Sequence, residues 1–388
     1  MMLIANPGSA SRKYALYESD KCIAKLHFEN VDKNIVYTFE QNGHKIGPRK
    51  AGISHLTFAA AKVLEILQDN KLAGGGQIPA VAVRIVAPSE YFQAHRILDE
   101  KSVQKLKRMA AEGFLHAGIV LQEIDIINSS IKPEKLIGIS DSAFHSTMPE
   151  FAGRYAISQM LTAKNGIRRF GYHGLSAESV TGQLRTANKL SARTVICHLG
   201  SGCSVTALRD GKSVDNSMGY SPLEGIMMAT RSGNIDVTAA QRLQEELSFS
   251  DEELQELLNN QSGLLGVSGK SSDIRDLLVL EKNDDGAARL ALKMFVYQVQ
   301  QGIGRMAAVL GGIDILVFTG TVGERSSEIR KRIVQNLHFL GLWLDARTNH
   351  QNLEHGAVTL ISKDHHPARI YVVPADEDQV MVMHALKV

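Results

Sequence analysis

Short apolar runs alternate with longer amphipathic segments along the chain. Runs rich in Val and Ile predict buried strands over residues 80–87, 193–200, 313–320 and 368–375. Apolar residues at helical spacing predict helices over 54–72 and 288–312. Ser250, followed by Glu253, predicts a capping box at the start of a further helix. The alternation predicts an α/β fold in which helices cover mixed sheets.

Two segments half a chain apart share one layout. Residues 3–17 and 195–212 each contain an apolar strand, a turn of Gly and Ser, and a second strand. Two similar domains, each supplying a phosphate-facing hairpin to a cleft between them, would give this pattern. Two unrelated hairpins with Gly-Ser turns would give it as well, so the repeat alone leaves both interpretations open.

Length and composition narrow the class of protein. A chain of 388 residues is of the right size for two ordinary domains. With 44% hydrophobic and 22% charged residues it has the composition of a soluble globular protein. A net charge of +2, with both signs mixed along the chain, gives no indication of nucleic-acid binding. No apolar run approaches the ~20 residues of a membrane span.

Other features of the chain favour the cytoplasm. The first residues lack the basic and apolar segments of a signal peptide. Cys22, Cys197 and Cys203 form no CxxC pair, so we expect reduced thiols rather than disulfides or metal ligands. We therefore expect a cytoplasmic protein with no membrane or nucleic-acid partner.

Three segments imitate nucleotide-binding motifs. The sequences DGKS (210–213) and SGKSS (268–272) end like a P-loop, but Thr206 and Leu264 stand where its first glycine is required. The sequence GSGCSV lacks one glycine of the dinucleotide motif, and Val205 continues a strand pattern rather than a helix. If phosphate binds at residues 200–204, hairpin amides and hydroxyls must hold it.

Several segments together resemble the acetate kinase (acetokinase) family, within the superfamily of acetate and sugar kinases, heat-shock ATPases and actin. The segments are NPGSASRK (6–13), DSAFHSTMP (141–149), RRFGYHGLS (168–176), HLGSGCSV (198–205), SMGYSPLEGIMMATRSGNID (217–236), NQSGLLGVSGKSSDIRDL (260–277), FTGTVGERSSEIR (318–330) and PADEDQV (374–380). They occur in the family's order from residue 3 to about 380.

The resemblance implies two similar ribonuclease-H-like (actin-like ATPase) domains with a cleft between them. We expect residues 1–147 and 374–388 to form the N-terminal domain. Residues 148–373 would form the C-terminal domain, which binds nucleotide and forms a homodimer.

The resemblance also assigns roles to individual residues. Catalytic roles fall on Arg84, Asp141, His173 and Arg231, and nucleotide binding falls on Lys13, His198, Gly200, Ser201, Gly202, Gly320, Gly323 and Glu324. Asn6, at the phosphoryl site, and Glu377 would contact Mg²⁺, with Asp141 near the same ion. Mn²⁺ is an alternative metal.

The residues themselves leave some of these roles open. A guanidinium inside an apolar strand, as at Arg84, requires an anion, which is either a protein carboxylate or a ligand. A histidine between glycines, as at His173, is in most proteins a core residue with satisfied hydrogen bonds. The resemblance favours the ligand in both cases, because paired arginines suit bidentate contacts to carboxylate and phosphoryl groups.

The implied activity is reversible, Mg²⁺-dependent transfer of a phosphoryl group from ATP to acetate, giving acetyl phosphate and ADP. Closure of the two domains would exclude water as a competing acceptor. Departures from the family pattern occur at Ala10, Ala87-Pro88-Ser89, Ala177, Ser201 and Arg325. They leave open another short-chain acid, such as propionate or butyrate, and another donor, such as pyrophosphate. An inactive nucleotide-binding protein of the same superfamily is the alternative from a different class.

Overall fold

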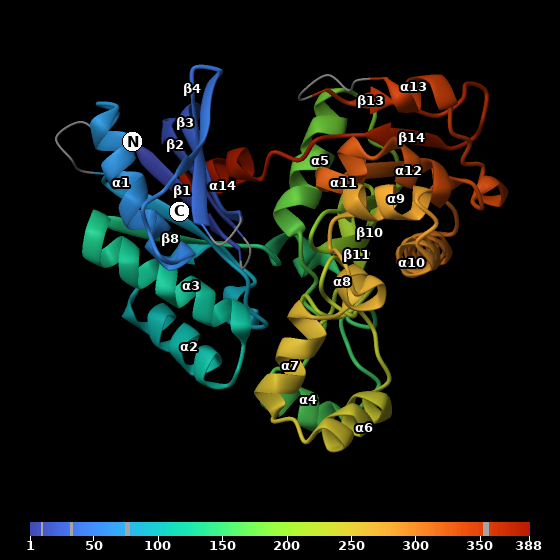
Figure 1. The fold of residues 1–388 in the computed structure, drawn as a ribbon, viewed down its shortest axis with the longest axis horizontal. Coiled ribbons are helices and arrows are strands. Elements are labelled where there is room, and N and C mark those ends of the chain that lie inside the picture. The colour runs from blue at the N-terminus through green and yellow to red at the C-terminus, as the bar shows by residue number, and fades with distance from the viewer. Residues whose placement is uncertain (9–10, 32–33, 74–77, 352–356) are drawn as a thin grey trace. The chain divides into compact units, whose positions relative to one another are not determined.

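The computed structural model describes residues 1–8, 11–31, 34–73, 78–351 and 357–388. By its contacts the chain divides into two compact units (Figure 1). Unit 1 comprises Met1–Ala143 and Glu377–Val388, and unit 2 comprises Phe144–Asp376. Ser9 and Ala10, which belong to the N-terminal motif, lie outside the described residues.

Unit 1 is built on an eight-stranded sheet. The strand order is β5-β4-β3-β2-β1-β6-β8-β7. The strands are β1 (Met2–Pro7), β2 (Ser11–Glu18), β3 (Lys21–Val31), β4 (Asn34–Gln41), β5 (His44–Lys50), β6 (Ala80–Ile85), β7 (Arg96–Ile97) and β8 (Lys135–Ser140).

Helices cover both faces of the central strands of unit 1. The helices are α1 (Ala59–Asp69), α2 (Glu100–Ala111), α3 (Leu115–Ile126) and α14 (Glu377–Ala385). Leu3, Ala5 and Val83 point into one hydrophobic core shared with α1, α2 and α3. The helix α14, from the end of the chain, packs against β1, β6 and β8 (Figure 1). Alternate residues of these strands therefore face α14.

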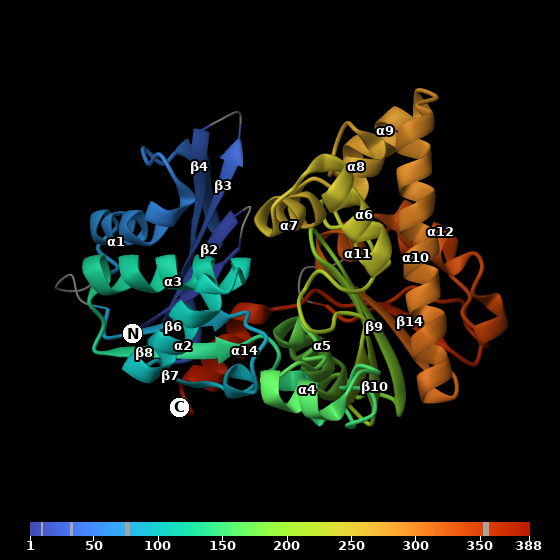
Figure 2. The ribbon, with the colours of Figure 1, turned by 90° about the horizontal axis from the view of Figure 1, so that it is seen from below.

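Unit 2 is built on a six-stranded sheet of order β11-β10-β9-β12-β14-β13. Its strands are β9 (Arg193–Leu199), β10 (Cys203–Arg209), β11 (Lys212–Asn216), β12 (Ile315–Thr319), β13 (Thr359–Leu360) and β14 (Arg369–Val372). Its helices are α4 (Gln159–Asn165), α5 (Gly174–Thr186), α6 (Val237–Leu247), α7 (Asp251–Asn260), α8 (Gly263–Ser268), α9 (Ile274–Lys282), α10 (Gly286–Leu310), α11 (Gly320–Arg325), α12 (Ser327–Val334) and α13 (Ala346–His350). Figure 2 shows the sheet between α5 and the long helix α10.

The two sheets share one topology. The order β3-β2-β1-β6-β8 in unit 1 corresponds to β11-β10-β9-β12-β14 in unit 2. In both, the first three strands are antiparallel and the last three are parallel. The register agrees as well, since Ala5 pairs with Val83 and Cys197 pairs with Phe318. This confirms the predicted fold class of two similar ribonuclease-H-like domains, and it makes Asn6 and His198 equivalent.

The elements predicted from sequence are confirmed. The four apolar runs form β6, β9, β12 and β14, and the two amphipathic segments contain α1 and α10. Ser250 and Glu253 form the capping box of α7. The DGKS segment is the β10–β11 hairpin turn, and Gly269 of SGKSS ends α8 in the left-handed conformation, so neither segment is a P-loop.

The cysteines are free thiols, as expected. Cys197 and Cys203 are buried, and burial raises the pKa of Cys203 to about 12, so that this thiol stays protonated. In the described part of the chain, no helix is both long enough and apolar enough to cross a membrane.

Replacing Ser250 tests the cap of α7. The Ser250→Ala substitution removes the hydroxyl that accepts a hydrogen bond from Glu253 N–H, so we expect about 1 kcal/mol of stability to be lost. Ser250→Asn keeps a good capping acceptor, so its free energy of unfolding should stay close to that of the wild type. Urea unfolding followed by circular dichroism measures both variants, and equal destabilisation by the two would contradict the capping role.

Candidate functional site

In unit 1 the predicted polar residues gather where the parallel strands end. Asn6 lies near the end of β1, Arg84 near the end of β6, and Asp141 directly follows β8. Glu377 is the first residue of α14, which packs on these strands. The carboxyl ends of parallel strands are the usual location of ligand sites in α/β proteins.

The guanidinium of Arg84 holds this cluster together. Its Nη2 lies 3.0 Å from Asp141 Oδ2, and its Nη1 lies 3.2 Å from Glu377 Oε2. Nη1 also donates to Asn6 Oδ1 at 3.2 Å, while Asn6 Nδ2 donates to Glu377 Oε2 at 3.1 Å. Burial alone would lower the pKa of Arg84, but the two carboxylates outweigh it and hold that pKa above its ordinary value. Arg84 therefore stays charged.

Lys13 lies beside this cluster. It pairs with Asn6 across the β1–β2 hairpin, and residues directly opposite each other in an antiparallel pair share one face of the sheet. Lys13 is exposed to solvent. The hairpin thus places an accessible cation next to Asn6.

The oxygen donors of unit 1 fit a magnesium ion. Mg²⁺ commonly takes one or two carboxylates together with water and substrate phosphates. Asp141 and Glu377 supply two carboxylates and Asn6 supplies an amide oxygen, and all three are drawn together by Arg84. Among the described residues, no group of three or more His, Cys, Asp or Glu side chains is arranged so that it could hold a metal ion by itself.

In unit 2 two histidines stack at the carboxyl end of β9, an inner strand of the sheet. His173 precedes α5 and His198 lies near the end of β9, with ring centroids 4.1 Å apart and planes inclined by 28°. His173 Nδ1 lies 3.0 Å from Ser204 Oγ, and His198 Nδ1 lies 2.7 Å from Ser176 Oγ. His173 adopts φ 58°, a left-handed conformation that is uncommon outside glycine and often occurs at functional sites.

The β9–β10 turn leaves room for these rings and for Arg231. A Cβ atom added at Gly202 would lie 3.1 Å from His173 Nε2 and 3.4 Å from Arg231 Nη1. A Cβ atom at Gly200 would lie 3.7 Å from His198 Nε2. Two imidazoles and a guanidinium therefore converge on the space above a turn that carries no side chain at either glycine. Such an arrangement suits the oxygens of a phosphoryl group.

Arg231 is held in place by its own loop. Its Nη1 donates to Pro222 O at 3.3 Å, and its backbone carbonyl accepts from Met228 N–H at 3.0 Å. Gly263, with φ 61°, lies so close that a Cβ there would be 2.7 Å from the Arg231 carbonyl oxygen. The start of α8 thus fixes the backbone beneath this guanidinium.

The segment GTVGE forms the first five residues of a short helix, α11. Gly320, with φ 76°, begins it so close to β9 that a Cβ would lie 2.7 Å from Leu199 O. Glu324 Oε1 accepts from Gly320 N–H at 3.0 Å, which satisfies one of the free amides at the start of the helix. Gly323 is buried against β9 and β12, where its Cβ would lie 3.7 Å from Cys197 O and 3.5 Å from Phe318 C.

The structure thus brings the predicted residues together in two sets. One set, in unit 1, contains Asn6, Lys13, Arg84, Asp141 and Glu377; the other, in unit 2, contains His173, His198, Gly200, Ser201, Gly202, Arg231, Gly320, Gly323 and Glu324. The predicted cleft and its closure concern the relation between the units and stay predictions.

Sequence reasoning missed several supporting residues. Ser176 and Ser204 form hydrogen bonds with the histidines, and only the spacing His173-x-x-Ser176 offered a signal. Arg330, 2% exposed, donates to Gly323 O at 2.9 Å, to Glu324 O at 2.7 Å and to Asn349. Burial lowers the pKa of Arg330 to about 10. Its position in the amphipathic pattern of α12 gave no sign of this role.

Arg12 was missed in unit 1. Its Nη1 donates to Gly8 O at 2.6 Å, which holds the backbone at the end of β1. Its Nε lies 3.5 Å from the buried carboxylate of Glu123, which also accepts from Tyr14 Oη at 2.6 Å. Burial is the main cause that raises the pKa of Glu123. No pattern in the sequence links Arg12 to a residue so distant in the chain.

The departures from the family pattern have identifiable places. Ala87 is buried in the core of unit 1, and Ser89 Oγ caps the turn that follows by accepting from Tyr91 N–H. Ala177 is buried in a core beneath α5. The Ser201 side chain is exposed on the turn, as is Arg325 at the end of α11. The exposed pair can touch a ligand, whereas the two alanines serve packing.

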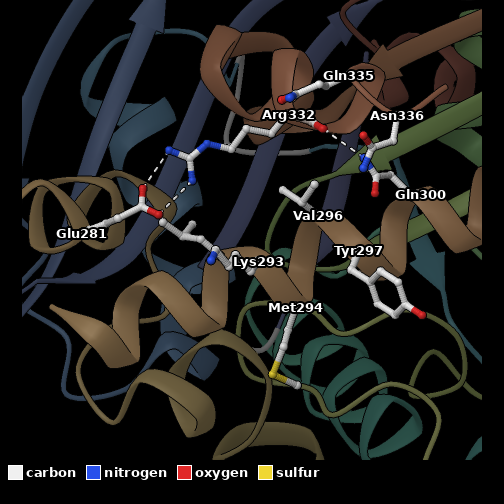
Figure 3. Close-up of a pocket in the computed structure, with 10 residues that line it drawn as sticks. Glu281, Lys293, Met294, Val296, Tyr297, Gln300, Arg332, Gln335 and Asn336 are labelled. Atoms are coloured by element: carbon white, nitrogen blue, oxygen red, sulfur yellow. Dashed lines mark hydrogen bonds and ion pairs between the residues drawn. The ribbon is translucent and has the colours of Figure 1, made fainter. Parts of the chain in front are cut away.

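A separate cavity of about 690 Å³ lies in unit 2 between α9, α10 and α12 (Figure 3). None of the predicted site residues lines it. Arg332 points into it, but its guanidinium is held by Glu281, at 2.7 and 3.1 Å, and by Glu328. Its charge is therefore already neutralised, and the cavity lacks the convergent donors found above Gly202.

Comparisons with known proteins point to one family. A model of the acetokinase family matches residues 1–383. An acetate kinase of Brachyspira hyodysenteriae is 36% identical over 394 residues, which cover 98% of each chain. The crystal structure of Porphyromonas gingivalis acetate kinase has a TM-score of 0.84 at 32% identity, covering 100% of this chain and 98% of that one. A propionate kinase from Francisella tularensis has a TM-score of 0.86 at 32% identity, covering 99% and 98%.

The Gly202→Ala substitution tests the convergence above the turn. The added methyl group would meet His173 Nε2 and Arg231 Nη1, so we expect turnover in a kinase assay to fall at least about tenfold, with little change in thermal stability. Gly304→Ala, on α10 where no atom lies within 4 Å of the new Cβ, is the control and should keep wild-type turnover. Equal turnover of both variants would contradict the assignment.

Proposed function

Because the chain belongs to the acetokinase family, we propose that it is an acetate kinase. The reaction is reversible transfer of the γ-phosphoryl group of ATP to acetate, which gives acetyl phosphate and ADP. A carboxylate oxygen attacks the γ-phosphorus in line, a new P–O bond forms, and the bond to the bridging oxygen of ADP breaks. Acetate is ionised at neutral pH, so no general base is required.

One observation carries the proposal. His173 and Arg231 converge on the space above Gly202, in a turn of the type that binds phosphate through its backbone. Phosphoryl transfer asks the protein for positioning and charge stabilisation rather than for covalent chemistry. An inactive nucleotide-binding protein would not need a guanidinium and two histidines held beside Gly200 and Gly202. The arrangement therefore favours a working kinase over that alternative.

The residues of unit 2 bind the transferring phosphoryl group and the nucleotide. The Arg231 guanidinium neutralises charge on the transferring group and its carboxylate acceptor, and His173 donates to an equatorial oxygen. His198 and the turn Gly200-Ser201-Gly202 contact nucleotide phosphates. Gly320, Gly323 and Glu324 form one wall of the adenosine pocket, where the absence of side chains allows close approach to the ring and ribose.

The residues of unit 1 bind the charged groups of the substrates and the metal ion. Arg84 binds the carboxylate and the phosphoryl group, and Lys13 contacts phosphate. Asn6, Asp141 and Glu377 hold Mg²⁺, or Mn²⁺, partly through water molecules. The metal ion, when bound, neutralises phosphate charge and orients the nucleotide. When the substrates bind, Arg84 gives up part of its contacts with Asp141 and Glu377 and contacts the substrate anions instead.

Propionate is the second candidate acceptor. The propionate kinase described above is as similar to this chain as the acetate kinase of Porphyromonas gingivalis, with 32% identity in both cases. Butyrate as acceptor rests on the changed segment Ala87-Pro88-Ser89, and pyrophosphate as donor rests on the exposed departures Ser201 and Arg325. A cytoplasmic protein would meet all of these small ions.

A hydroxylamine trap for acyl phosphate tests the reaction. Acetate, propionate and butyrate are each combined with ATP or pyrophosphate, with and without Mg²⁺. We expect product from acetate and MgATP, none after chelation of the metal, and a loss of about 10²-fold or more in Arg231→Ala. The Gly304→Ala variant serves as the matched control. Failure of every pair to give product, in a protein that binds ATP, would refute the kinase and leave the inactive binding protein.

We also infer that the protein forms a homodimer through unit 2. Phe151, Met160 and Val237 expose 86, 75 and 70% of their surface there, and large apolar side chains so exposed commonly mark interfaces. Light scattering should give twice the chain mass. Phe151→Asp combined with Met160→Asp should shift the mass toward the monomer, whereas Phe58→Asp, at a residue of unit 1 that is 45% exposed, should not. A monomeric wild type at micromolar concentration would refute the dimer.

A further inference from the structure

Two buried serine hydroxyls each bind one histidine of the stacked pair. Ser204 Oγ lies 3.0 Å from His173 Nδ1, and Ser176 Oγ lies 2.7 Å from His198 Nδ1. Both serines are 0% exposed. Ser204 also lies directly opposite His198 in the β9–β10 hairpin, and Ser176 belongs to the first turn of the helix that His173 precedes. Ser204, which binds His173, thus lies on β10 beside His198, and Ser176, which binds His198, lies on the helix that follows His173.

The hydroxyl protons determine which ring nitrogen carries hydrogen. A buried hydroxyl that donates to nothing costs about 1–3 kcal/mol. Within the described residues the histidine nitrogen is the partner of each hydroxyl. Each Oγ–H therefore donates to Nδ1, which accepts with its lone pair. In the neutral ring the remaining proton then resides on Nε2.

The Nε2 atoms lie close to the two glycines of the β9–β10 turn, Gly200 and Gly202. A Cβ at Gly202 would lie 3.1 Å from His173 Nε2, and a Cβ at Gly200 would lie 3.7 Å from His198 Nε2. Neutral rings with hydrogen on Nε2 would direct two N–H donors into the same space. The positive charge in that space is supplied by Arg231, whose Nη1 lies 3.4 Å from the Gly202 position.

We propose that Ser204 and Ser176 are positioning residues that fix both histidines as neutral Nε2–H donors to the phosphate oxygens. The inference rests on the proposed function, because it names the donors for the group that is transferred. Each Nε2 lies near a glycine of one turn, His173 Nε2 near Gly202 and His198 Nε2 near Gly200, so both N–H bonds can serve a phosphate bound at that turn. Two imidazolium ions with centroids 4.1 Å apart would repel each other, so the neutral form also suits the stack.

The alanine variants should separate the orientation of the histidine rings, which affects kcat, from the binding of ATP, which affects KM. In Ser204→Ala and Ser176→Ala the rings lose their fixed tautomer, and we expect kcat to fall about tenfold while KM for ATP changes less than about threefold. Thr194→Val is the matched control. It removes a 0% exposed hydroxyl from the start of β9, the strand that carries His198, where Thr194 Oγ1 donates to Ser191 O, and it should keep wild-type kcat.

Long-range ¹H–¹⁵N spectra of ¹⁵N-histidine-labelled protein read the tautomer directly. His173→Gln and His198→Gln assign the two signals. Wild-type protein should show both rings with hydrogen on Nε2, and each alanine variant should show a mixture at its own ring. This measurement needs only folded wild-type protein for its first result. Hydrogen on Nδ1 in the wild type would overturn the proposal, whether or not the variants fold.

The outcomes of the two proposals are distinguishable. An active wild type whose kcat is unchanged in both alanine variants overturns the positioning role and leaves the kinase intact. A wild type that gives no acyl phosphate overturns the kinase, and with it the catalytic purpose of the serines, even where the tautomer is as stated.

Discussion

The charge of Arg84 is the constraint on which unit 1 depends. A guanidinium inside the apolar strand β6 is costly unless carboxylates neutralise it. Asp141 comes from the end of β8 and Glu377 from the start of α14, near the end of the chain. One cation therefore ties together three elements far apart in sequence, and it gathers the oxygen donors proposed to hold the metal ion. The electrostatics that make the cluster stable also prepare it for anionic substrates.

The two sheets use one topology for different chemistry. By register, Asn6 corresponds to His198, and Arg84, which follows Val83, corresponds to Thr319. Unit 1 places a cation and carboxylates at these equivalent strand ends. Unit 2 places stacked imidazoles there and brings its guanidinium, Arg231, from a loop. In both units a glycine, Gly8 or Gly200, directly follows the strand. The shared geometry thus accounts for the repeat in the sequence.

Sequence reasoning reached the chemical residues but not their supports. Arg84 and His173 stand out because a charged or polar group occurs where apolar or small residues prevail. Ser176, Ser204, Arg12 and Arg330 do not stand out, since serines and arginines are common in strands and on amphipathic helices. Their importance lies in which atom they meet, such as Gly8 O or His173 Nδ1. Such partners depend on the packing of elements that the local pattern leaves unspecified.

The sequence by itself determined the strands β6, β9, β12 and β14, the helices α1 and α10, the capping box and the family motifs, because each is encoded in the periodicity and spacing of neighbouring residues. It also determined that DGKS is no P-loop, since a required glycine is absent. Only the tertiary structure decided that GTVGE forms a helix, that His173 adopts φ 58°, and that two histidines stack. These features arise where β9, β10, α5 and α11 meet, and contacts between distant elements outweigh local preference there.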